Sequence, residues 1–403
     1  MSEHPCSITL RRPARVGEGL RPGVRRVFTK ECPPNGGRND SATSPTRHLA
    51  RGYPANMFAD RVPVVTPPVG IPWMTSSQIA TARVTTEATR TIVGTASAPR
   101  RSIGPSDLQV YPIALSGNVF GWMADDAASE QVLDRYVAFG GNFIDTADSY
   151  AGGRSEIIIG NWMRSRRSRD DIVLATKVGK SADHPGLTAR AIEAAVTASL
   201  RRLRTDRIDL LYLHIDDPDV PFEETLLAVD ELVRAGKVRY FGGSHHTGDR
   251  LIEARIASAQ LGVARMVALQ NHYNLVFRRE YEEGLSRIAV DLALGVMPRF
   301  ALASGFLSGK YRSKADLDGS PRGSEVTRFV NRAGLRVLQA LDAVVAEHDA
   351  PMATVALAWL LSKPNVVAPV VSASAADQVF DLISATEVKL TRSQLTALDR
   401  ASA

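Results

Sequence analysis

The sequence has little cysteine and no long apolar run. It contains two cysteines, Cys6 and Cys32, among 403 residues, which is too few for a disulfide scaffold or a zinc site built from cysteines. No segment approaches the about 18 consecutive apolar residues that a membrane-spanning helix needs, and we expect no membrane partner. The remaining composition, with 44% hydrophobic and 23% charged residues, is typical of a soluble globular protein.

Positive charge is concentrated at one end of the chain. The formal net charge is +6, but residues 1–101 contain 15 Lys or Arg and only 6 Asp or Glu, whereas residues 102–403 contain 34 and 37. An argument from basicity to nucleic acid could therefore rest only on the first quarter. Its arginines are scattered and hardly interleaved with aromatic residues, so we expect no nucleic-acid partner.

The first quarter has the composition of a disordered, basic leader. Residues 1–101 contain 12 of the 22 prolines, a density that interrupts helices and sheet ladders. A segment that buries so little apolar surface cannot offset its ordering entropy. A coding start placed too far upstream would explain it, with Met57 or Met74 as alternative starts. A targeting peptide is a second interpretation, because the segment is arginine-rich and poor in acids, and a nucleic-acid-binding arm is the third. The sequence does not decide whether this leader belongs to the mature protein.

From residue 102 on, short apolar segments alternate with amphipathic ones. The short segments are rich in Val, Ile and Leu, as strands buried on both faces should be. The predicted strands are Val110–Leu115, Asn142–Asp145, Ile172–Lys177, Ile208–His214, Val238–Ser244, Met266–Gln270, Gly295–Phe300 and Val366–Val371. The predicted helices are Ala127–Ala138, Glu156–Arg164, Thr188–Leu203, Glu223–Ala235, Asp249–Leu261, Glu280–Asp291, Met352–Leu361 and Asp377–Ser384.

This alternation predicts an α/β fold in residues 102–403, a (β/α)8 TIM barrel. Eight strand–helix alternations in about 300 residues are what such a barrel requires. A doubly wound open sheet is the main rival. That fold normally carries the pattern G-x-G-x-x-G after its first strand, and no such pattern occurs there.

Polar side chains end consecutive predicted strands, where a barrel places its chemistry. Asp145, Lys177 and His214 end three successive strands, and Tyr150 follows Asp145 by five residues. Taken singly, each has an ordinary explanation: the aspartate as a helix N-cap, the histidine as a structural residue and the lysine as a group that reaches solvent. Their convergence on one face favours a catalytic role for all four.

These four residue types form a set that can protonate an oxygen. A phenol titrates near pH 10, and a lysine held by a carboxylate lowers that pKa towards the working range. An imidazole beside the phenol orients a carbonyl oxygen or relays the proton. Because residues 102–403 contain no cysteine for redox chemistry, a hydride that arrives at the carbon must come from a cofactor.

Several long motifs then follow one another in order and with regular spacing. They are GGNFIDTADSY at 140–150, Gly153–Glu156 with Gly160, Ala175–Lys177, Arg207–His214, and Glu231–Tyr240 with Gly242 and Ser244. Through them, residues 102–403 resemble the aldo-keto reductase superfamily over nearly their whole length. The resemblance implies a barrel that binds NADPH, or alternatively NADH, without a Rossmann domain.

The resemblance also implies roles for the four strand-end residues. Tyr150 would be the general acid, Lys177 and Asp145 the pair that lowers its pKa, and His214 the group that orients the substrate. Ser244 and Gln270 match residues that hold the nicotinamide carboxamide in the family.

Further residues are assigned to the cofactor by the same resemblance. His245 stands where the family has an asparagine that contacts the carboxamide, and Arg299 stands where a ring stacks on the nicotinamide, with Phe300 next to it. Residues 303–312 resemble the loop that wraps the pyrophosphate, and the segment near the last strand resembles the site of the adenosine 2′-phosphate and adenine. The residues assigned to these two segments are Ser304, Gly305 and Lys310 in the first, and Ser372, Ser374 and Gln378 in the second. Leu302, at the end of the segment that contains Arg299 and Phe300, is assigned to the cofactor as well.

Three other features have ordinary interpretations. His245 and His246 are adjacent, but no further ligand has a suitable spacing, so we expect no metal site. Trp122 follows the first predicted strand and is either a wall of the substrate pocket or a packing residue. The polar tract Arg312–Arg328 is predicted to be a surface insertion that precedes a helix.

The sequence therefore predicts a cytoplasmic enzyme that uses NADPH to reduce an aldehyde or ketone to the alcohol, reversibly. Its expected partner is a small-molecule carbonyl compound. The first alternative is an NADPH-binding sensor or regulatory module with little turnover, like the channel β-subunits of the superfamily; Arg299 and His245 motivate it. A cofactor-free barrel lyase or isomerase is the second. The sequence identifies neither the carbonyl substrate nor the oligomeric state.

Overall fold

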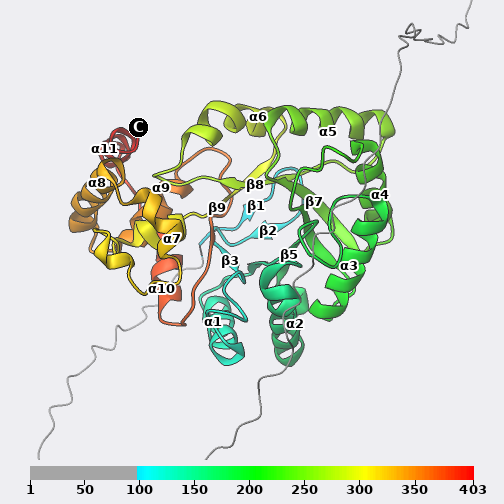
Figure 1. The fold of residues 1–403 in the computed structure, drawn as a ribbon, viewed down its shortest axis with the longest axis horizontal. Coiled ribbons are helices and arrows are strands. Elements are labelled where there is room, and N and C mark those ends of the chain that lie inside the picture. The colour runs from blue at the N-terminus through cyan, green and yellow to red at the C-terminus, as the bar shows by residue number, and fades with distance from the viewer. Residues whose placement is uncertain (1–97) are drawn as a thin grey trace, which may run out of the picture. The chain divides into compact units, whose positions relative to one another are not determined.

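A ring of eight parallel strands forms the centre of the molecule (Figure 1). The computed structural model describes residues 98–403, and most of the predicted leader, residues 1–97, lies outside them. The order around the ring is β10-β3-β4-β5-β6-β7-β8-β9, and every neighbouring pair is parallel. The strands are β3 Ala114–Ser116, β4 Phe143–Asp145, β5 Val173–Val178, β6 Ile208–Leu213, β7 Val238–Ser244, β8 Ala268–His272, β9 Gly295–Arg299 and β10 Val370–Val371.

The last gap in the ring is closed by the segment that leads into β10. Val296 of β9 pairs in parallel with Val366, and its N–H and C=O bond to Asn365 O and Val367 N at 2.9 and 2.8 Å. A closed barrel has no free sheet edge. The predicted (β/α)8 barrel is therefore confirmed, and the open doubly wound sheet is excluded.

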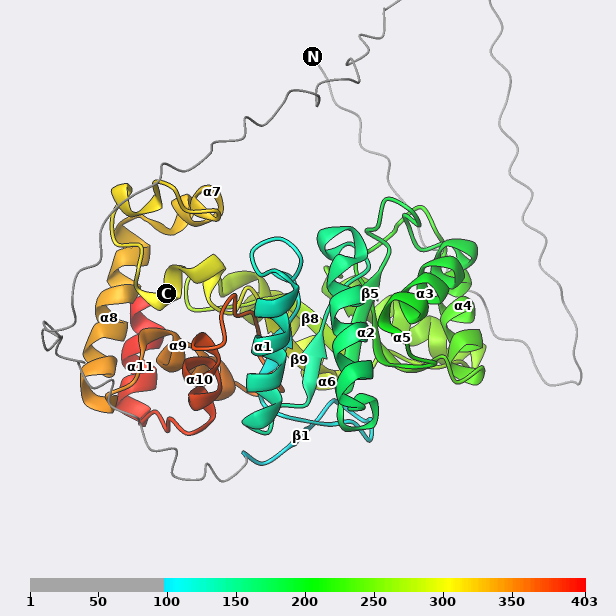
Figure 2. The ribbon, with the colours of Figure 1, turned by 90° about the horizontal axis from the view of Figure 1, so that it is seen from below.

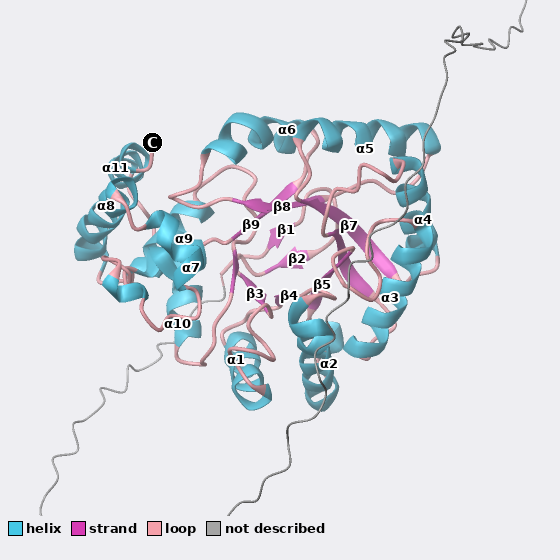
Figure 3. Cartoon of the chain, in the orientation of Figure 1, coloured by secondary structure: helices cyan, strands magenta, loops and turns pink. Residues whose placement is uncertain are grey.

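Helices surround the strands on the outside (Figure 3). The spacing of buried residues within the helices explains this placement. In α3 the buried residues recur at intervals of one, three and four, which puts them on one face of the helix. They are Ile192, Ala195, Val196, Ser199 and Leu203. Among the described residues, the helices of the barrel are α1 Asp126–Ala138, α2 Arg154–Arg166, α3 Ala189–Leu203, α4 Phe222–Arg234, α5 Gly248–Leu261, α6 Ser286–Asp291, α9 Met352–Leu361 and α10 Gln378–Ile383. None of the helices in residues 98–403 is long and apolar enough to cross a membrane.

Three further helices lie in the last quarter of the chain. They are α7 Gly323–Val326, α8 Arg332–His348 and α11 Arg392–Ala401. Helices α8 and α11 lie side by side in two views (Figure 1, Figure 2), and Arg336 Nε of α8 donates to Ala401 O of α11 at 3.0 Å. The sequence prediction placed a helix after residue 328 without bounds and missed α11, although Thr391 and Gln394 form a capping box at its start.

Prolines shorten two predicted strands. The predicted strand Val110–Leu115 is two elements: β2, Gln109–Val110, pairs antiparallel with β1, Arg101–Ser102, and the barrel strand β3 begins only after Pro112. Pro369 likewise precedes the two-residue strand β10. Proline has no N–H to give to a ladder, so strands end beside it. Strand β1 also spans the predicted boundary between residues 101 and 102.

The β1–β2 hairpin covers the amino ends of the barrel strands. Its residues Ile103, Leu108 and Val110 are buried in one apolar cluster with interior barrel residues such as Phe143 and Leu210. Gly104 lies so close to Val267 and Ala293 that a Cβ on it would clash with their backbone oxygens. The hairpin therefore fills this end of the barrel and leaves the carboxyl ends of the strands as the open end.

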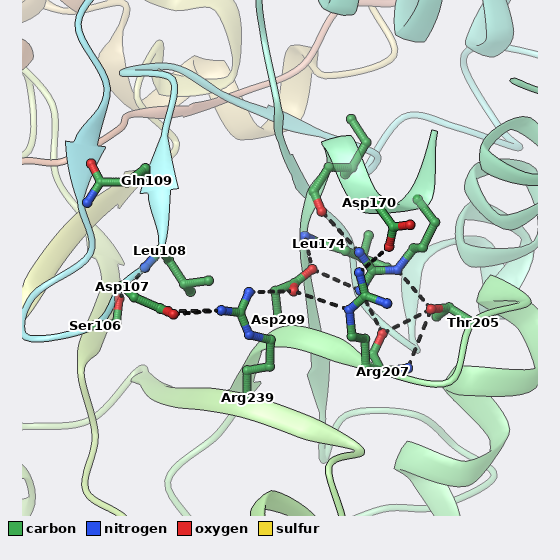
Figure 4. A network of polar contacts seen from close by, with 12 residues as sticks. Ser106, Asp107, Leu108, Gln109, Asp170, Leu174, Thr205, Arg207, Asp209 and Arg239 are labelled. Atoms are coloured by element: carbon green, nitrogen blue, oxygen red, sulfur yellow. Dashed lines mark hydrogen bonds and ion pairs between the residues drawn. The ribbon is translucent and has the colours of Figure 1, made fainter. Parts of the chain in front are cut away.

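A buried carboxylate ties this closed end together (Figure 4). Asp209 of β6 is 2% exposed, and its Oδ2 accepts from Leu174 N and pairs with Arg169, both at 2.9 Å. Its Oδ1 accepts from Arg239 at 3.2 Å, and Arg239 also binds Asp107 of the hairpin at 2.9 Å. One buried charge thus links three strands, β5, β6 and β7, to the hairpin.

The change Asp209→Asn keeps the shape of the side chain but removes the negative charge that these arginines share. We expect the free energy of unfolding, measured in urea, to fall by about 3 kcal/mol. Removing one member of a buried ion pair leaves the charges of its partners buried and uncompensated. Asp206→Asn is the control, since that exposed carboxylate lies 3.6 Å from Arg207 and surface pairs contribute below about 1 kcal/mol. Equal losses in the two variants would contradict a special role for Asp209.

Candidate functional site

One cavity of about 820 Å³ opens at the carboxyl ends of the strands. Side chains at the ends of β3, β8 and β9 line it, and it extends to α10. This is the size and the place at which a barrel binds small molecules and cofactors. Predicted site residues in its wall are Tyr150, His214, His245, Gln270, Arg299, Phe300, Leu302, Ser304, Gly305, Lys310, Ser372, Ser374 and Gln378.

The ammonium group of Lys177 is the centre of the site. Lys177 and Asp145 are completely buried, and Lys177 Nζ donates to Asp145 Oδ2 at 2.6 Å and to Thr146 O at 2.8 Å. Its third acceptor is Tyr150 Oη, 3.3 Å away. An ammonium has three donors, so all three are used, and one of them is directed at the phenol.

Asp145 is itself held by two neighbours. Gln270 Nε2 donates to Asp145 Oδ1 at 2.8 Å, and Ser116 Oγ lies 3.4 Å from Oδ2. The family resemblance assigned Gln270 to the cofactor, and the sequence did not indicate this bond to Asp145. The register explains it, because Asp145 ends β4, Ser116 ends the adjacent β3 and Gln270 lies near the end of β8.

The loop after β4 presents Tyr150 through a tight turn. Ala151, Gly152 and Gly153 all have positive φ, at 48°, 62° and 87°, and glycine adopts this conformation without a steric penalty. The turn leads directly into α2. At its base, Thr146 Oγ1 and Ser155 Oγ lie 2.8 Å apart in buried surroundings, which fixes the loop against the start of α2.

The pKa of Tyr150 differs from the sequence expectation. Burial raises the pKa of the phenol, Lys177 lowers it and Asp145 raises it, and the balance lies above the ordinary value. The lysine therefore reduces the rise but does not bring the pKa into the neutral range, because the phenol is taken out of water. At neutral pH the phenol carries its proton, which is the form that a general acid requires.

His214 follows β6 and faces the phenol edge-on, with 6.1 Å between the ring centroids. Burial and the nearby ammonium of Lys177 lower its pKa to about 2, so the ring is neutral. Its Nδ1 is buried and has no hydrogen-bond partner among the described residues. A neutral imidazole can donate an N–H to a carbonyl oxygen but cannot act as a cationic acid, which favours orientation over proton relay.

His245 lies between two cations that the sequence did not place together. Its Nε2 is 3.0 Å from Lys180 Nζ, and its Nδ1 is 3.2 Å from Arg299 Nη2. Burial and the Arg299 charge lower the pKa of His245 to about 4. The guanidinium of Arg299 also lies over the ring of Phe300, 4.8 Å from its centroid. Lys180 was not predicted as a site residue, although it follows Lys177 by only three positions.

The predicted pyrophosphate loop is connected to the tract that follows it. Ser304 Oγ donates to Glu325 Oε2 at 2.6 Å, a contact that the sequence did not indicate. Three residues of that tract, Ser320, Pro321 and Arg322, line the cavity. The tract Arg312–Arg328 is largely exposed and precedes α8, as predicted for a surface insertion, but α7 and its flanking turns also pack against the loop.

The other end of the cavity contains the predicted adenosine residues. Gln378 Oε1 accepts from Ser374 N at 3.0 Å, so the start of α10 is bonded to the segment after β10. Ser244 is the predicted cofactor residue that does not line the cavity; it is completely buried, and its Oγ has no hydrogen-bond partner among the described residues. Trp122 is 57% exposed and outside the cavity wall, whereas its neighbour Met123 lines it.

The family can now be stated from this barrel and its site. The model of the Aldo/keto reductase family matches residues 114–403. This chain belongs to the aldo/keto reductase family. The match covers the whole barrel from β3 onward and every residue of the site described above.

Curated relatives of this aldo/keto reductase family member have names of two kinds. Norsolorinic acid reductase B of Aspergillus parasiticus is 31% identical over 326 residues, which cover 75% of this chain and 83% of the relative. The oxidoreductase YrpG of Bacillus subtilis is 32% identical, covering 74% and 94%. A "Probable voltage-gated potassium channel subunit beta" of Arabidopsis thaliana is 30% identical, covering 72% and 91%. The family and the reductase names make this chain an oxidoreductase of the carbonyl-reducing type.

The site of this family member shows no metal-binding arrangement in residues 98–403, where no three His, Cys, Asp or Glu side chains are grouped to hold an ion. His246 Nδ1 lies 2.9 Å from Ser244 O, and its ring stacks on Phe222. His246 is thus bonded and packed away from the cavity wall.

Neutral histidines, of which His214 and His272 are buried, make stability depend on pH. The pKa values of His214, His245 and His272 are lowered by burial to about 2, 4 and 3, whereas an unfolded histidine titrates near 6.5. Below pH 6.5 the unfolded chain therefore binds more protons, and stability falls as pH falls. Asp148, whose pKa burial raises to about 7, offsets part of this.

We therefore expect the free energy of unfolding to decrease from pH 6.5 to pH 4. The variant His214→Gln lacks one of these groups, so its decrease should be shallower than that of the unchanged chain. Urea titrations at half-unit steps measure both slopes. A stability that rises over this range would contradict the assignment of neutral histidines in the folded protein.

Proposed function

We propose that this protein catalyses the NADPH-dependent, reversible reduction of an aldehyde or ketone to the alcohol, with Tyr150 as the general acid. The observation that carries the proposal is the buried chain of contacts from Asp145 through Lys177 to the phenol oxygen. A phenol beside a fixed ammonium, on the wall of the cavity, is arranged to give up a proton in a water-poor site.

The cavity wall suits a dinucleotide. Its loop 303–308 contains the positive-φ residues Ser304 and Gly305, which allow the backbone to approach a phosphate closely, and Lys310 and Arg322 add positive charge to the wall. NADPH would supply the hydride for the carbonyl carbon when bound. NADH is the alternative cofactor.

We infer the roles of the chain's residues in proton transfer from this arrangement. His214 donates an N–H to the carbonyl oxygen and fixes it beside the phenol. Tyr150 Oη gives its proton to that oxygen as the carbon–oxygen π bond becomes a C–H and an O–H bond. The phenolate left behind is stabilised by the Lys177 ammonium, and Asp145 keeps that ammonium in place. Solvent then returns a proton to the phenolate.

A second candidate function is an NADPH-binding regulatory module with little turnover. Two observations favour it: a relative is named as a potassium channel subunit beta, and Arg299 and His245 depart from the residues that the family has at the nicotinamide. Both candidates bind the cofactor. A panel of aldehydes and ketones separates them, because tight NADPH binding without reduction of any compound would favour the module.

The change Tyr150→Phe tests the proposed general acid. Removing the phenol oxygen should lower kcat for carbonyl reduction about 10²- to 10⁴-fold and leave the Kd for NADPH within about twofold, because no cofactor contact is assigned to that oxygen. Tyr240→Phe is the matched control, since Tyr240 is not in the cavity wall. Full activity of Tyr150→Phe would refute the role.

The change Glu325→Gln tests the proposed pyrophosphate loop. The carboxylate of Glu325 holds the hydroxyl of Ser304 and places negative charge beside a site for phosphates. Removing that charge should tighten NADPH binding about threefold in a fluorescence titration, a change typical of one partly exposed charge. Glu193→Gln, an exposed position outside the cavity wall, should change nothing. Weaker binding by Glu325→Gln would contradict the placement of the phosphates.

A further inference from the structure

Arg299 places a positive charge at the end of the cavity where Tyr150 lies. Arg299 ends β9 and lines the cavity, and its Nη2 lies 3.2 Å from His245 Nδ1. The ring of His245 lies 6.1 Å from that of His214, which in turn lies 6.1 Å from the ring of Tyr150. All four side chains belong to the wall of one cavity. The guanidinium and the proposed proton donor therefore lie at the same end of it.

No carboxylate in contact neutralises the charge of Arg299. Among residues 98–403, no ion pair within 4 Å joins Arg299 to an aspartate or glutamate. Glu280 interacts with it only over a longer range. Burial lowers the pKa of Arg299, but a guanidinium stays protonated at neutral pH in proteins. The side chain is therefore a full positive charge on the cavity wall.

The titratable groups around Arg299 are affected by this charge. Burial, followed by Arg299, lowers the pKa of His245 to about 4. After burial and Lys177, Arg299 also contributes to the low pKa of His214. Burial raises the pKa of Tyr150, and Arg299 is one of the charges that reduce the rise. Both groups that are assigned to the carbonyl oxygen, Tyr150 and His214, therefore lie within reach of this charge.

The aromatic rings of the cavity wall already lie beside cations of the protein. In the described part of the chain, the Phe and Tyr rings of the wall are Tyr150, Phe300 and Tyr311. Lys177, Arg299 and Lys310 lie over them, at 5.0, 4.8 and 4.9 Å from the ring centroids. An aromatic face attracts a cation, but a cationic ligand at any of these rings would lie near a like charge.

The charge balance of the wall has the same sign. Among the described residues, its charged side chains are Lys180, Arg299, Lys310 and Arg322 and one acid, Asp381 of α10. Lys310 and Arg322 belong to the end that we propose for the phosphates. Lys180 is exposed, so water and salt screen its charge. Arg299 therefore remains as the less exposed positive charge at the end of the cavity that contains Tyr150.

The two redox forms of a nicotinamide cofactor differ in charge at one place. The nicotinamide ring is neutral in NADPH and carries a positive charge in NADP⁺, whereas the phosphates are the same. Hydride transfer requires this ring to contact the carbonyl carbon, which the proposed function places beside Tyr150 and His214. The oxidised ring thus brings a second cation near Arg299 in a partly buried site, where like charges repel strongly. The reduced ring does not.

We propose that Arg299 makes this site selective for the redox state of its cofactor, so that the protein binds NADPH tightly and NADP⁺ weakly. The inference rests on the proposed function and deepens it by assigning a preferred direction. A site that releases the oxidised cofactor readily is easily refilled with NADPH, and it is poorly loaded for the oxidation of an alcohol.

The test measures the Kd values of NADPH and NADP⁺ for the full-length protein by calorimetry. No carbonyl compound is present, so binding is separated from the chemical step. We expect the unchanged protein to prefer NADPH at least tenfold, as two like charges a few ångströms apart in a partly buried site predict. In Arg299→Gln this preference should fall at least fivefold, chiefly because NADP⁺ binds more tightly.

Three further variants serve as controls. Arg299→Lys keeps the charge and should keep most of the preference. Arg299→Tyr should lose it, because a neutral aromatic face attracts the oxidised ring. Arg201→Gln, which removes an exposed arginine outside the cavity wall, should keep all of it. A panel of aldehydes and ketones is assayed with the same preparations.

The outcomes separate this inference from the proposed function. If Arg299→Gln weakens the binding of both forms equally, Arg299 holds a phosphate and the inference is wrong. If the unchanged protein binds both forms equally and reduces a carbonyl compound, the inference is refuted and the reductase proposal stands. If NADPH is preferred through Arg299 but no compound is reduced, the inference stands and the reductase proposal fails. Binding of neither form would refute both.

Discussion

The bond between the buried ammonium of Lys177 and the carboxylate of Asp145 is the constraint on which the site depends. Two opposite charges without solvent exposure are stable only when their remaining donors and acceptors are satisfied. Thr146, Gln270 and Tyr150 provide those partners. The phenol is therefore one of the groups that make the buried pair tolerable, and its orientation follows from that requirement.

The barrel gives this pair its surroundings. Parallel strands bring side chains that lie far apart in the sequence to one end, and the hairpin β1–β2 with its Asp209 network closes the other end. The site is thus built on rigid strand ends, while the cavity wall comes from loops and from α10. Loops can therefore change the chemistry of the wall without moving the residues at the strand ends.

Sequence reasoning predicted the barrel because eight apolar segments recur with amphipathic segments between them. It also predicted that Asp145, Tyr150, Lys177 and His214 would meet, since consecutive parallel strands end on the same face. The assigned roles of these residues remain predictions. Prolines shortened two of the predicted strands. The start of α11 was missed, although the sequence contains its capping box, Thr391 and Gln394.

Other features depend on distances that no local pattern encodes. The pKa of Tyr150 is raised because burial outweighs the lysine, and the amount of burial is known only once the loops are folded. The contact between Lys180, His245 and Arg299 joins three strand ends through a residue with positive φ. The bond from Ser304 to Glu325 requires the tract after residue 312 to fold back on its own loop.

The central claim is that the Lys177 ammonium stabilises the phenolate formed when Tyr150 gives up its proton. The most direct test is the single-turnover rate of NADPH oxidation when enzyme–NADPH is mixed with an aldehyde, for the unchanged protein and for Lys177→Met, with NADPH affinity as the check on folding. The account predicts a rate at least 10²-fold lower in the variant, with cofactor affinity nearly unchanged. An unchanged single-turnover rate in a folded, NADPH-binding Lys177→Met would contradict it.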